Sequence, residues 1–313
     1  MNENNDKERL ARLRPALEKR SLIIEAVKKH FCDQGFLEVE TPMRIPSPAP
    51  ELHIDAEPSG ARFLITSPEL QMKRMLATEQ YNRIFQICRC FRRGERGENH
   101  LPEFTMIEWY RAGAGIAELM EDCEEMIRCA AVACDVFPRV HRKNATVDLS
   151  PPWERMSVAD AFEKFAGWRP GASPDPRMFD KDLVDKVEPA LASTCRPVFL
   201  AGYPASMASL ARLSPNDPST AERFELYAGG LELANGFAEL TDPVEQRKRF
   251  EDEESARRVA GKQPYTIDER FLHALESGLA PCAGIALGID RLVMLLIGAE
   301  KIDDVVAFPE GTT

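Results

Sequence analysis

Apolar positions recur along this chain in two different spacings, and the change from one to the other separates helices from strands. Residues 9–34 predict a helix, because apolar side chains recur at helical spacing and Gly35 follows them. Residues 115–134 predict another helix, in which Met and Cys side chains belong to the core. The segments "FQICRCF" and "EFTMIEWY" are typical of buried strands, so residues 84–110 predict a hairpin around a charged loop.

Proline and capping residues mark two further helices. "FLEVETPMRIPSPAPE" predicts a strand interrupted by prolines, and "RFLITSPELQMKRMLA" predicts a strand that leads into a helix. In the second segment Ser67 is the expected N-cap and Pro68 the first helical residue. "TDPVEQRKRFEDEESARRVA" predicts a helix with Asp242 at the N-cap and Glu245 at the capping-box position, and its many charges are expected to form a solvated face.

The remaining segments predict a sheet. "PVFLAGYPASMASLARL" and "RFELYAGGLELANGFAEL" predict strands joined by turns at Gly229-Gly230 and at Gly236. "CAGIALGIDRLVMLLIG" predicts a strand and a turn that lead into a helix, and the irregular, proline-rich residues 135–200 predict an elaboration. Strands that mostly follow one another, with helices between them, favour an α+β fold: a mostly antiparallel sheet flanked by helices, as a single domain over residues 1–313.

Composition removes several classes of function. The net charge of -11 over 313 residues argues against a nucleic-acid binder, which needs a basic face. The eight cysteines show no C-x-x-C pair, so they predict reduced thiols and neither a zinc site nor a disulfide framework; Cys88 and Cys90 alternate like neighbours on one strand face. The N-terminus has no apolar core of a signal peptide, and the run "LVMLLIGA" is too short to span a bilayer. We therefore expect a cytoplasmic protein with no membrane partner.

Three stretches resemble the signature motifs of the class II aminoacyl-tRNA synthetases, most closely in the lysine branch. "GFLEVETPMRIPSPAPE" is similar to motif 1, whose proline, Pro42 here, lies at the dimer interface in that family. "FRRGERGENHLPEFTMIEWY" is similar to motif 2, and "GIALGIDRLVML" to motif 3 with Arg291 as its arginine. The resemblance runs from about residue 20 to the end of the chain. It implies the α+β fold of that family and a homodimer.

Within the lysine branch, "YPASMASLARL", "ELANGFAELTD" and "PEFTMIEWYR" resemble stand-alone paralogs that attach β-lysine to a lysine of elongation factor P. A lysyl-tRNA synthetase also carries an anticodon-reading domain, and this chain leaves no room for one. The resemblance therefore implies a ligase that activates (R)-β-lysine with ATP as the adenylate, then transfers it to elongation factor P without using tRNA. Two alternatives stay open: a truncated lysyl-tRNA synthetase that charges tRNA, and a non-catalytic paralog that binds an amino acid.

The resemblance assigns two catalytic arginines. Arg92 would clamp the α-phosphate and the substrate carboxylate, and Arg291 the γ-phosphate, since an anion that attacks a polyanion needs its charge neutralised. Phe104 would stack on adenine, and Glu225 and Glu232 would bind Mg²⁺, which prefers oxygen ligands. The full ATP site implied in this way consists of Arg92, Arg93, Gly94, Glu95, His100, Phe104, Glu232, Leu233, Gly288 and Arg291.

The resemblance also assigns an amino-acid pocket, formed by Ser67, Pro68, Glu69, Glu108, Tyr110, Asn235, Phe237, Glu239 and Ala286. A lysine-like substrate brings two ammonium groups, and buried cations need carboxylates. Glu69 also has a structural explanation, because the helix dipole favours a glutamate in the first turn of a helix. His100 is equally explained as a histidine with a structural role and no contact with the substrate. Ala286 stands where lysyl-tRNA synthetases have glycine; its methyl group favours an amine one carbon further out by about 1–3 kcal/mol.

Two residues depart from the motif 2 pattern. Gly94 occupies the position of a glutamate that contacts the adenine amino group in the family, and Glu95 follows it. Leu101 occupies a position where the paralogs have an asparagine near ATP. Both positions concern adenine and neither concerns the phosphates. The sequence thus predicts either that Glu95 takes over the contact or that nucleotide binding is weaker.

Overall fold

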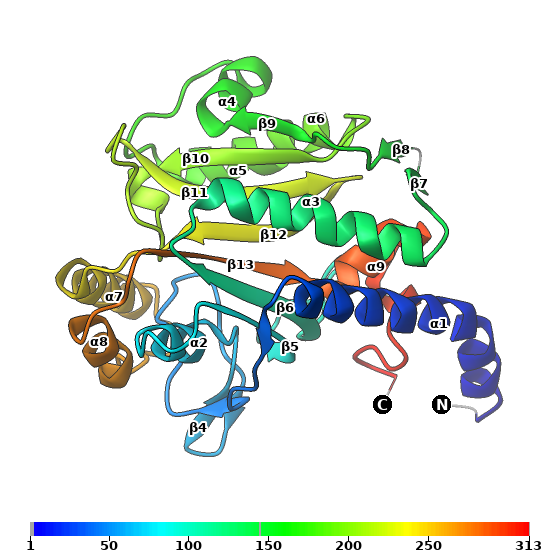
Figure 1. The fold of residues 1–313 in the computed structure, drawn as a ribbon, viewed down its shortest axis with the longest axis horizontal. Coiled ribbons are helices and arrows are strands. Elements are labelled where there is room, and N and C mark those ends of the chain that lie inside the picture. The colour runs from blue at the N-terminus through cyan, green and yellow to red at the C-terminus, as the bar shows by residue number, and fades with distance from the viewer. Residues whose placement is uncertain (1–2, 144, 313) are drawn as a thin grey trace.

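An eight-stranded sheet forms the centre of the computed structural model, which describes residues 3–143 and 145–312 (Figure 1). In spatial order its strands are β1 (Leu37–Glu38), β5 (Arg83–Phe91), β6 (Glu103–Ala112), β13 (Cys282–Gly288), β12 (Leu231–Ala238), β11 (Thr220–Ala228), β10 (Val198–Pro204) and β9 (Glu154–Ser157). The two outermost pairs are parallel and all inner pairs are antiparallel. The predicted α+β fold with a mostly antiparallel sheet is therefore confirmed.

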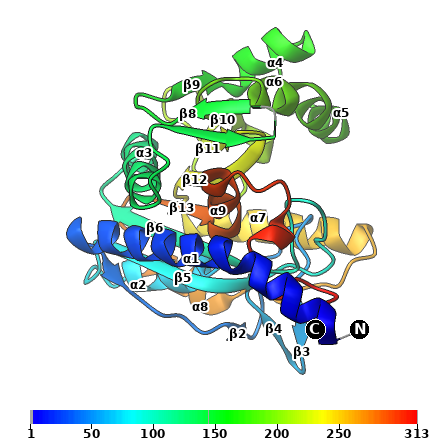
Figure 2. The ribbon, with the colours of Figure 1, turned by 90° about the vertical axis from the view of Figure 1, so that its right-hand side faces the viewer.

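Helices lie on both faces of this sheet. They are α1 (Glu3–Asp33), α2 (Glu69–Leu76), α3 (Ile116–Ala133), α4 (Val158–Ala166), α5 (Pro176–Asp182), α6 (Glu188–Ala192), α7 (Pro243–Val259), α8 (Glu269–Glu276) and α9 (Ile289–Ile297). Short helical turns are η1 (Leu183–Val187), η2 (Ala205–Met207) and η3 (Ile302–Asp304), and small sheets are formed by β2 (Arg44–Ile45), β3 (Pro58–Ser59) and β4 (Arg62–Leu64) and by β7 (Arg139–Arg142) and β8 (Ala145–Asp148). Figure 2 shows α4, α5 and α6 grouped at one end of the molecule and α1 crossing the other.

The strands divide the core into layers, because successive side chains of a strand point to opposite faces. Trp109 of β6 and Phe199 of β10 are buried in the largest apolar cluster, together with α1, α3 and α9. Tyr110, the next residue of β6, belongs to a second cluster with α2, α7 and α8. Leu200 of β10 packs with α4, α5 and α6 in a third. The layer that contains α3 thus lies on the other side of the sheet from Tyr110.

Most predicted elements are confirmed, including the hairpin of β5 and β6, the helix α3 and the turn at Gly229-Gly230. Cys88 and Cys90 do share a strand face, with their Sγ atoms 3.8 Å apart, and all eight cysteines are free thiols. The first helix begins earlier than residue 9, at Glu3, and continues through Pro15. The single-domain organisation over residues 1–313 stays a prediction. In its favour, β9 from the segment 135–200 pairs with β10 in the central sheet.

Three local predictions were wrong. Ser67 does not cap α2: the helix begins at Glu69, and Pro68 occupies the N-cap position without a side-chain hydrogen bond. Gly236 is not in a turn but inside β12, where a Cβ atom would lie 2.6 Å from the ring of Phe224, so only glycine fits. The charges of α7 are not all solvated, because Arg257 is fully buried.

The capping of α7 is confirmed at Asp242, whose side chain accepts hydrogen bonds from the backbone N–H groups of Val244 and Glu245. The carboxylate of Glu245 instead accepts from Arg249 at 2.9 Å, one helical turn further along. Across residues 3–143 and 145–312, no helix is both long enough and apolar enough to span a membrane.

Candidate active site

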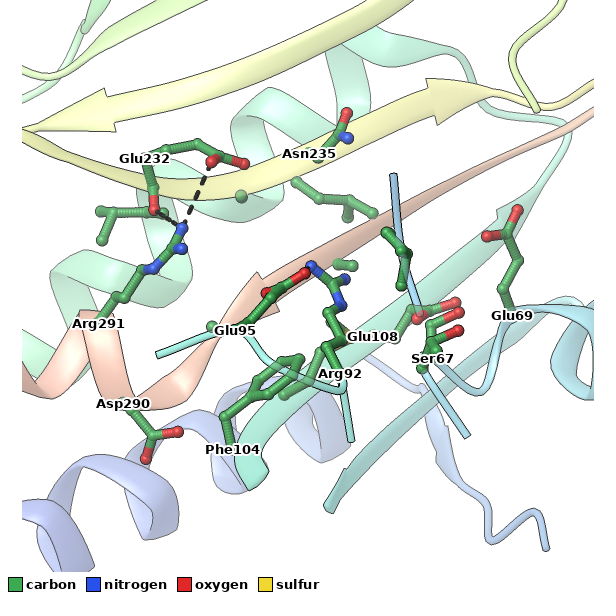
Figure 3. A pocket seen from close by; sticks show the side chains of 18 of the residues that line it. Ser67, Glu69, Arg92, Glu95, Phe104, Glu108, Glu232, Asn235, Asp290 and Arg291 are labelled. Carbon is green, nitrogen blue, oxygen red and sulfur yellow. Dashed lines mark hydrogen bonds and ion pairs between the residues drawn. The ribbon is translucent and has the colours of Figure 1, made fainter. Parts of the chain in front are cut away.

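A cavity of about 1050 Å³, part of it open to solvent, lies on the sheet face that carries Tyr110. Side chains reach it from β6, β12 and β13, from α2, from the start of α9 and from the loop between β5 and β6 (Figure 3). Arg291 and Glu69 lie at opposite ends of this cavity in Figure 3, and Arg92 is drawn between them. The cavity therefore has two chemically different ends.

Arg291 organises the first end. It lies in the first turn of α9, and its Nη1 donates to the backbone oxygen of Glu232 at 2.7 Å, while Nε donates to that of Asn99 at 3.2 Å. Nη2 donates to Nε2 of His100 at 2.5 Å. Burial, together with the guanidinium groups of Arg291 and Arg92, lowers the pKa of His100 to about 4. His100 is therefore a neutral acceptor that orients Arg291, and it carries no charge at neutral pH.

Arg92 occupies the middle of the cavity and directly follows β5. Its backbone N–H donates to Pro102 O at 2.8 Å, which holds the residue against the next strand. The guanidinium lies 5.1 Å from the ring centroid of Phe104 and 4.0 Å from the carboxylate of Glu95. Its Nε has no hydrogen-bond partner within the part of the chain that the structure describes. Arg92 is thus held in place through its backbone, and its side chain retains a donor for an anion.

Carboxylates dominate the opposite end. Nζ of Lys73, a fully buried side chain of α2, forms ion pairs with Glu69 at 2.6 Å and with Glu239. Burial raises the pKa of Glu239 to about 8, with a further contribution from Glu69, and the Lys73 ammonium opposes this rise. Burial would lower the pKa of Lys73, but the two carboxylates outweigh it and keep that pKa above its usual value. The ammonium group of Lys73 therefore stays charged between its two partners.

Glu108 and Tyr110 complete this acidic end from β6. The Tyr110 hydroxyl donates to Glu108 Oε1 at 2.5 Å. Burial, and after it the charge of Glu69, raises the pKa of Glu108 well above its ordinary value. Neither Glu108 Oε2 nor Glu239 Oε1 has a hydrogen-bond partner among residues 3–143 and 145–312. Buried oxygens without donors are costly, so this end is suited to a ligand that brings N–H groups.

The predicted metal ligands differ in their surroundings. Glu232 lines the cavity, whereas Glu225 is buried outside its lining, with Oε1 accepting from Arg223 and Oε2 from the hydroxyls of Tyr203 and Tyr227. Burial and the charge of Glu225 raise the pKa of Glu232. Glu188, from the segment 135–200, lies beside Glu232. Burial, and after it the negative charges of Glu232 and Glu225, raises the pKa of Glu188 to about 7. A concentration of carboxylates that repel one another fits a divalent cation such as Mg²⁺.

Most of the predicted site residues come together in this one cavity. Its lining includes Ser67, Glu69, Arg92, Glu95, His100, Phe104, Glu108, Tyr110, Glu232, Leu233, Asn235, Phe237, Glu239, Ala286, Gly288 and Arg291. The lining does not include Pro68, Arg93, Gly94 or Glu225. Gly94 takes a left-handed φ of 76° in the turn after β5, and the next residue, Glu95, is the one that reaches the cavity. Of these two residues, Glu95 is thus the one that could contact a ligand in the cavity.

Sequence reasoning missed several polar residues at or beside the cavity. Glu51, Thr66, Asn99 and Asp290 line it, Lys73 pairs with two of its carboxylates, and Glu188 lies beside Glu232. Asp290 directly precedes Arg291 and accepts hydrogen bonds from Arg20 of α1 at 2.5 Å and from Thr105 N at 2.7 Å. Asn99 and Asp290 are sequence neighbours of predicted site residues, which was a usable signal. Lys73 carried a weaker one, since it stands one helical turn after Glu69.

Comparisons with known proteins identify the family of this chain. Residues 5–312 match the family model described as tRNA synthetases class II (D, K and N). Three relatives named elongation factor P–(R)-β-lysine ligase, from Proteus mirabilis, Yersinia enterocolitica and Pectobacterium atrosepticum, are 39%, 38% and 40% identical to this chain. The alignments cover 93–94% of this chain and 93–94% of each relative. The chain belongs to the class II aminoacyl-tRNA synthetases and, among them, to the family of the elongation factor P–(R)-β-lysine ligases.

Proposed function

We propose that this protein activates (R)-β-lysine with ATP and transfers the β-lysyl group from the adenylate to a lysine of elongation factor P. The observation that carries the proposal is the charge distribution of the cavity. When ionised, Glu69, Glu108 and Glu239 carry three negative charges and Lys73 balances one of them. The two that remain equal the two ammonium groups of a diamino acid.

The other end of the cavity suits the nucleotide. Activation is the attack of the substrate carboxylate on the α-phosphate of ATP, and two anions approach one another only when nearby cations neutralise them. Arg92, in the middle of the cavity, would bind the substrate carboxylate and the α-phosphate together. Arg291, which neutral His100 orients, would bind the outer phosphates. Phe104, against which Arg92 packs, offers a ring face to adenine.

Glu232 and Glu188, with Glu225 behind them, would hold Mg²⁺ at this end. Mg²⁺ held there would supply positive charge against the negative charge that develops on the pyrophosphate. Glu225 already accepts from Arg223, Tyr203 and Tyr227. The part of Glu225 is therefore to keep negative potential next to Glu232.

Ala286 supports the choice of a β-amino acid. In the register of the sheet it pairs with Glu108 on one side and with Asn235 on the other, and it lines the cavity. Its methyl group therefore takes up space between two groups that we assign to the amino acid. A methyl group in such a position discriminates by about 1–3 kcal/mol, so Ala286→Gly should improve α-lysine relative to β-lysine by about tenfold or more.

The experiment separates activation from transfer. The protein is incubated with ATP, Mg²⁺ and (R)-β-lysine or α-lysine, and ATP–pyrophosphate exchange is measured; elongation factor P or tRNA is then added and its mass gain or charging is determined. Exchange with β-lysine together with one β-lysyl addition on elongation factor P supports the proposal. Exchange with α-lysine and charging of tRNA would identify a tRNA synthetase instead, and no exchange with either amino acid would identify a binding protein.

A matched pair of variants ties the result to the cavity. Arg92→Ala removes the central guanidinium and should lower exchange by at least about 100-fold. Arg89→Ala removes a guanidinium from β5, the strand that Arg92 follows, where it is half exposed and 3.7 Å from Glu103, and should leave exchange unchanged. Equal loss in both variants would contradict the role of Arg92.

We also propose a homodimer, as motif 1 implies. Leu22 of α1, Leu37 of β1 and Met43, beside Pro42, expose 43%, 52% and 48% of their surface. Leu37 and Met43 are large apolar side chains that are exposed within motif 1, and together with Leu22 of the preceding helix they support an interface there. Light scattering should give twice the mass of one chain, and Leu37→Glu should shift the protein toward that of a monomer.

A further inference from the structure

Glu51 lines the cavity, although none of the activation chemistry above uses it. It lies in the loop between β2 and β3 and is half-buried. Buried Arg257 of α7 holds this loop: its Nη1 donates to the backbone oxygens of Glu51 at 2.6 Å and Ile54 at 3.0 Å, and its Nη2 donates to Asp55 at 2.7 Å. The carboxyl group of Glu51 is therefore carried on a fixed backbone at the wall of the cavity.

The charged groups around Glu51 locate it along the cavity. Burial raises its pKa to about 7; Glu69 of α2 and Glu253 of α7 add to this rise, and Arg92 and Arg223 oppose it. Glu69 belongs to the acidic end and Arg92 to the middle, and Glu51 lines the same cavity, so its carboxyl group is assigned to the junction of the two. An adenylate bound as proposed above would place its carbonyl carbon at this junction, between its ammonium groups and its phosphate.

The transfer step needs a group of this kind. The acceptor is a lysine side chain whose ammonium form, predominant at neutral pH, has no lone pair with which to attack a carbonyl carbon. Building on the proposed function, we infer that Glu51 is the general base that deprotonates the acceptor lysine for attack on the β-lysyl adenylate. Its partial exposure leaves it accessible to an amine that enters from another protein.

The protons and electron pairs of this step balance. One proton of the acceptor ammonium moves to the Glu51 carboxylate, and the freed lone pair forms the C–N bond to the carbonyl carbon. The bond from that carbon to the phosphate oxygen breaks, and AMP leaves with the electron pair. A second proton passes from the nitrogen to the departing phosphate, the third remains in the amide N–H, and Glu51 releases its proton to solvent.

A pKa of about 7 suits this role. A carboxylate with that value takes a proton from an ammonium group about 300-fold more favourably than one with the ordinary glutamate value, and about half of it is ionised at pH 7. Below pH 7 the carboxyl group is protonated and no longer acts as a base. Single-turnover transfer to elongation factor P should therefore fall about tenfold per pH unit below pH 7 and level off above it.

The test compares Glu51→Gln with Glu57→Gln, the same substitution at an exposed position of the same loop. For Glu51→Gln we expect ATP–pyrophosphate exchange and the KM for β-lysine within about threefold of the unmodified protein, and transfer to elongation factor P lower by about 100-fold or more at pH 7. Trapping of the adenylate by hydroxylamine, which is already uncharged at pH 7, should be unchanged. Glu57→Gln should leave all of these quantities unchanged.

Each other result overturns the inference. If Glu51→Gln transfers normally, the group is not a base. If exchange and transfer fall together, its role is structural, and if only the KM for β-lysine rises, Glu51 binds the substrate ammonium group. Absence of exchange in the unmodified protein would instead contradict the proposed function itself.

Discussion

Replacing Lys73 with methionine would remove the buried ammonium group from between Glu69 and Glu239. The Lys73 side chain is 0% exposed, and its carboxylate partners are 14% and 1% exposed. Removing one partner of such a buried pair costs about 3–5 kcal/mol, because the remaining charge has lost its compensation. Glu69 keeps some contact with water and Glu239 can take up a proton, so we expect the lower value, about 3 kcal/mol, in the free energy of unfolding.

Urea unfolding followed by tryptophan fluorescence at pH 7 measures this loss. The double variant Lys73→Met/Glu239→Gln should recover more than half of it, because the uncompensated carboxylate is then absent as well. Lys28→Met, which removes an exposed partner of Glu38, serves as the control and should leave the midpoint unchanged. A cost below about 1 kcal/mol for Lys73→Met, or a double variant no more stable than the single one, would refute the reasoning.

Three further outcomes follow from the site. Gly284→Ala places a Cβ atom 2.6 Å from Glu239 Oε1 and in collision with the Tyr110 ring, so the Kd for β-lysine should rise at least about tenfold, whereas Gly171→Ala, where nothing lies within 4 Å, should not change it. The pKa of Glu239 is about 8 and an ammonium ligand needs the ionised form, so binding releases a proton: the Kd should fall as pH rises from 6 to 8, and calorimetry in two buffers of different ionisation heat should detect the release. A pH-independent Kd would contradict this. The His100→Gln variant keeps a hydrogen-bond acceptor for Arg291, so its Kd for ATP should lie within about threefold of that of the unmodified protein. Residue 100 should add no pH dependence to this Kd between pH 5 and 8 in either protein, because the pKa of His100 is about 4.

Periodicity predicted the elements well where one face of each is buried. The helix α3 has such a face, whereas β6 is buried on both faces over most of its length and was identified by its apolar run. The wrong predictions concern residue types that occur in more than one structural context. Serine and proline before Glu69 are typical of a helix start, yet the chain enters the helix one residue later than expected. Gly236 is typical of a turn, but its actual reason is the close approach of Phe224 from the neighbouring strand, a contact between strands that local pattern does not reveal.

The candidate site divides in the same way. Residues inside the motifs, such as Arg92 and Arg291, could be found because the motifs include them. Lys73 and Glu51 depend on tertiary contacts: one is defined by two carboxylates from different elements, and the other by a loop that Arg257 holds from about two hundred residues further along the chain. A lysine after a glutamate in a helix and a glutamate after a proline are common at surfaces, so the sequence favours no special role for either.

The contact between Arg20 and Asp290 has a consequence at a distance. Asp290 joins the first helix of the chain to the backbone of Thr105 and adjoins Arg291, so one carboxylate couples the N-terminal helix to the triphosphate end of the cavity. Deleting the first 20 residues, Arg20 included, would thus disturb nucleotide turnover, although the deleted residues do not line that cavity. A partner that displaced this helix would act as an inhibitor without ever competing with ATP.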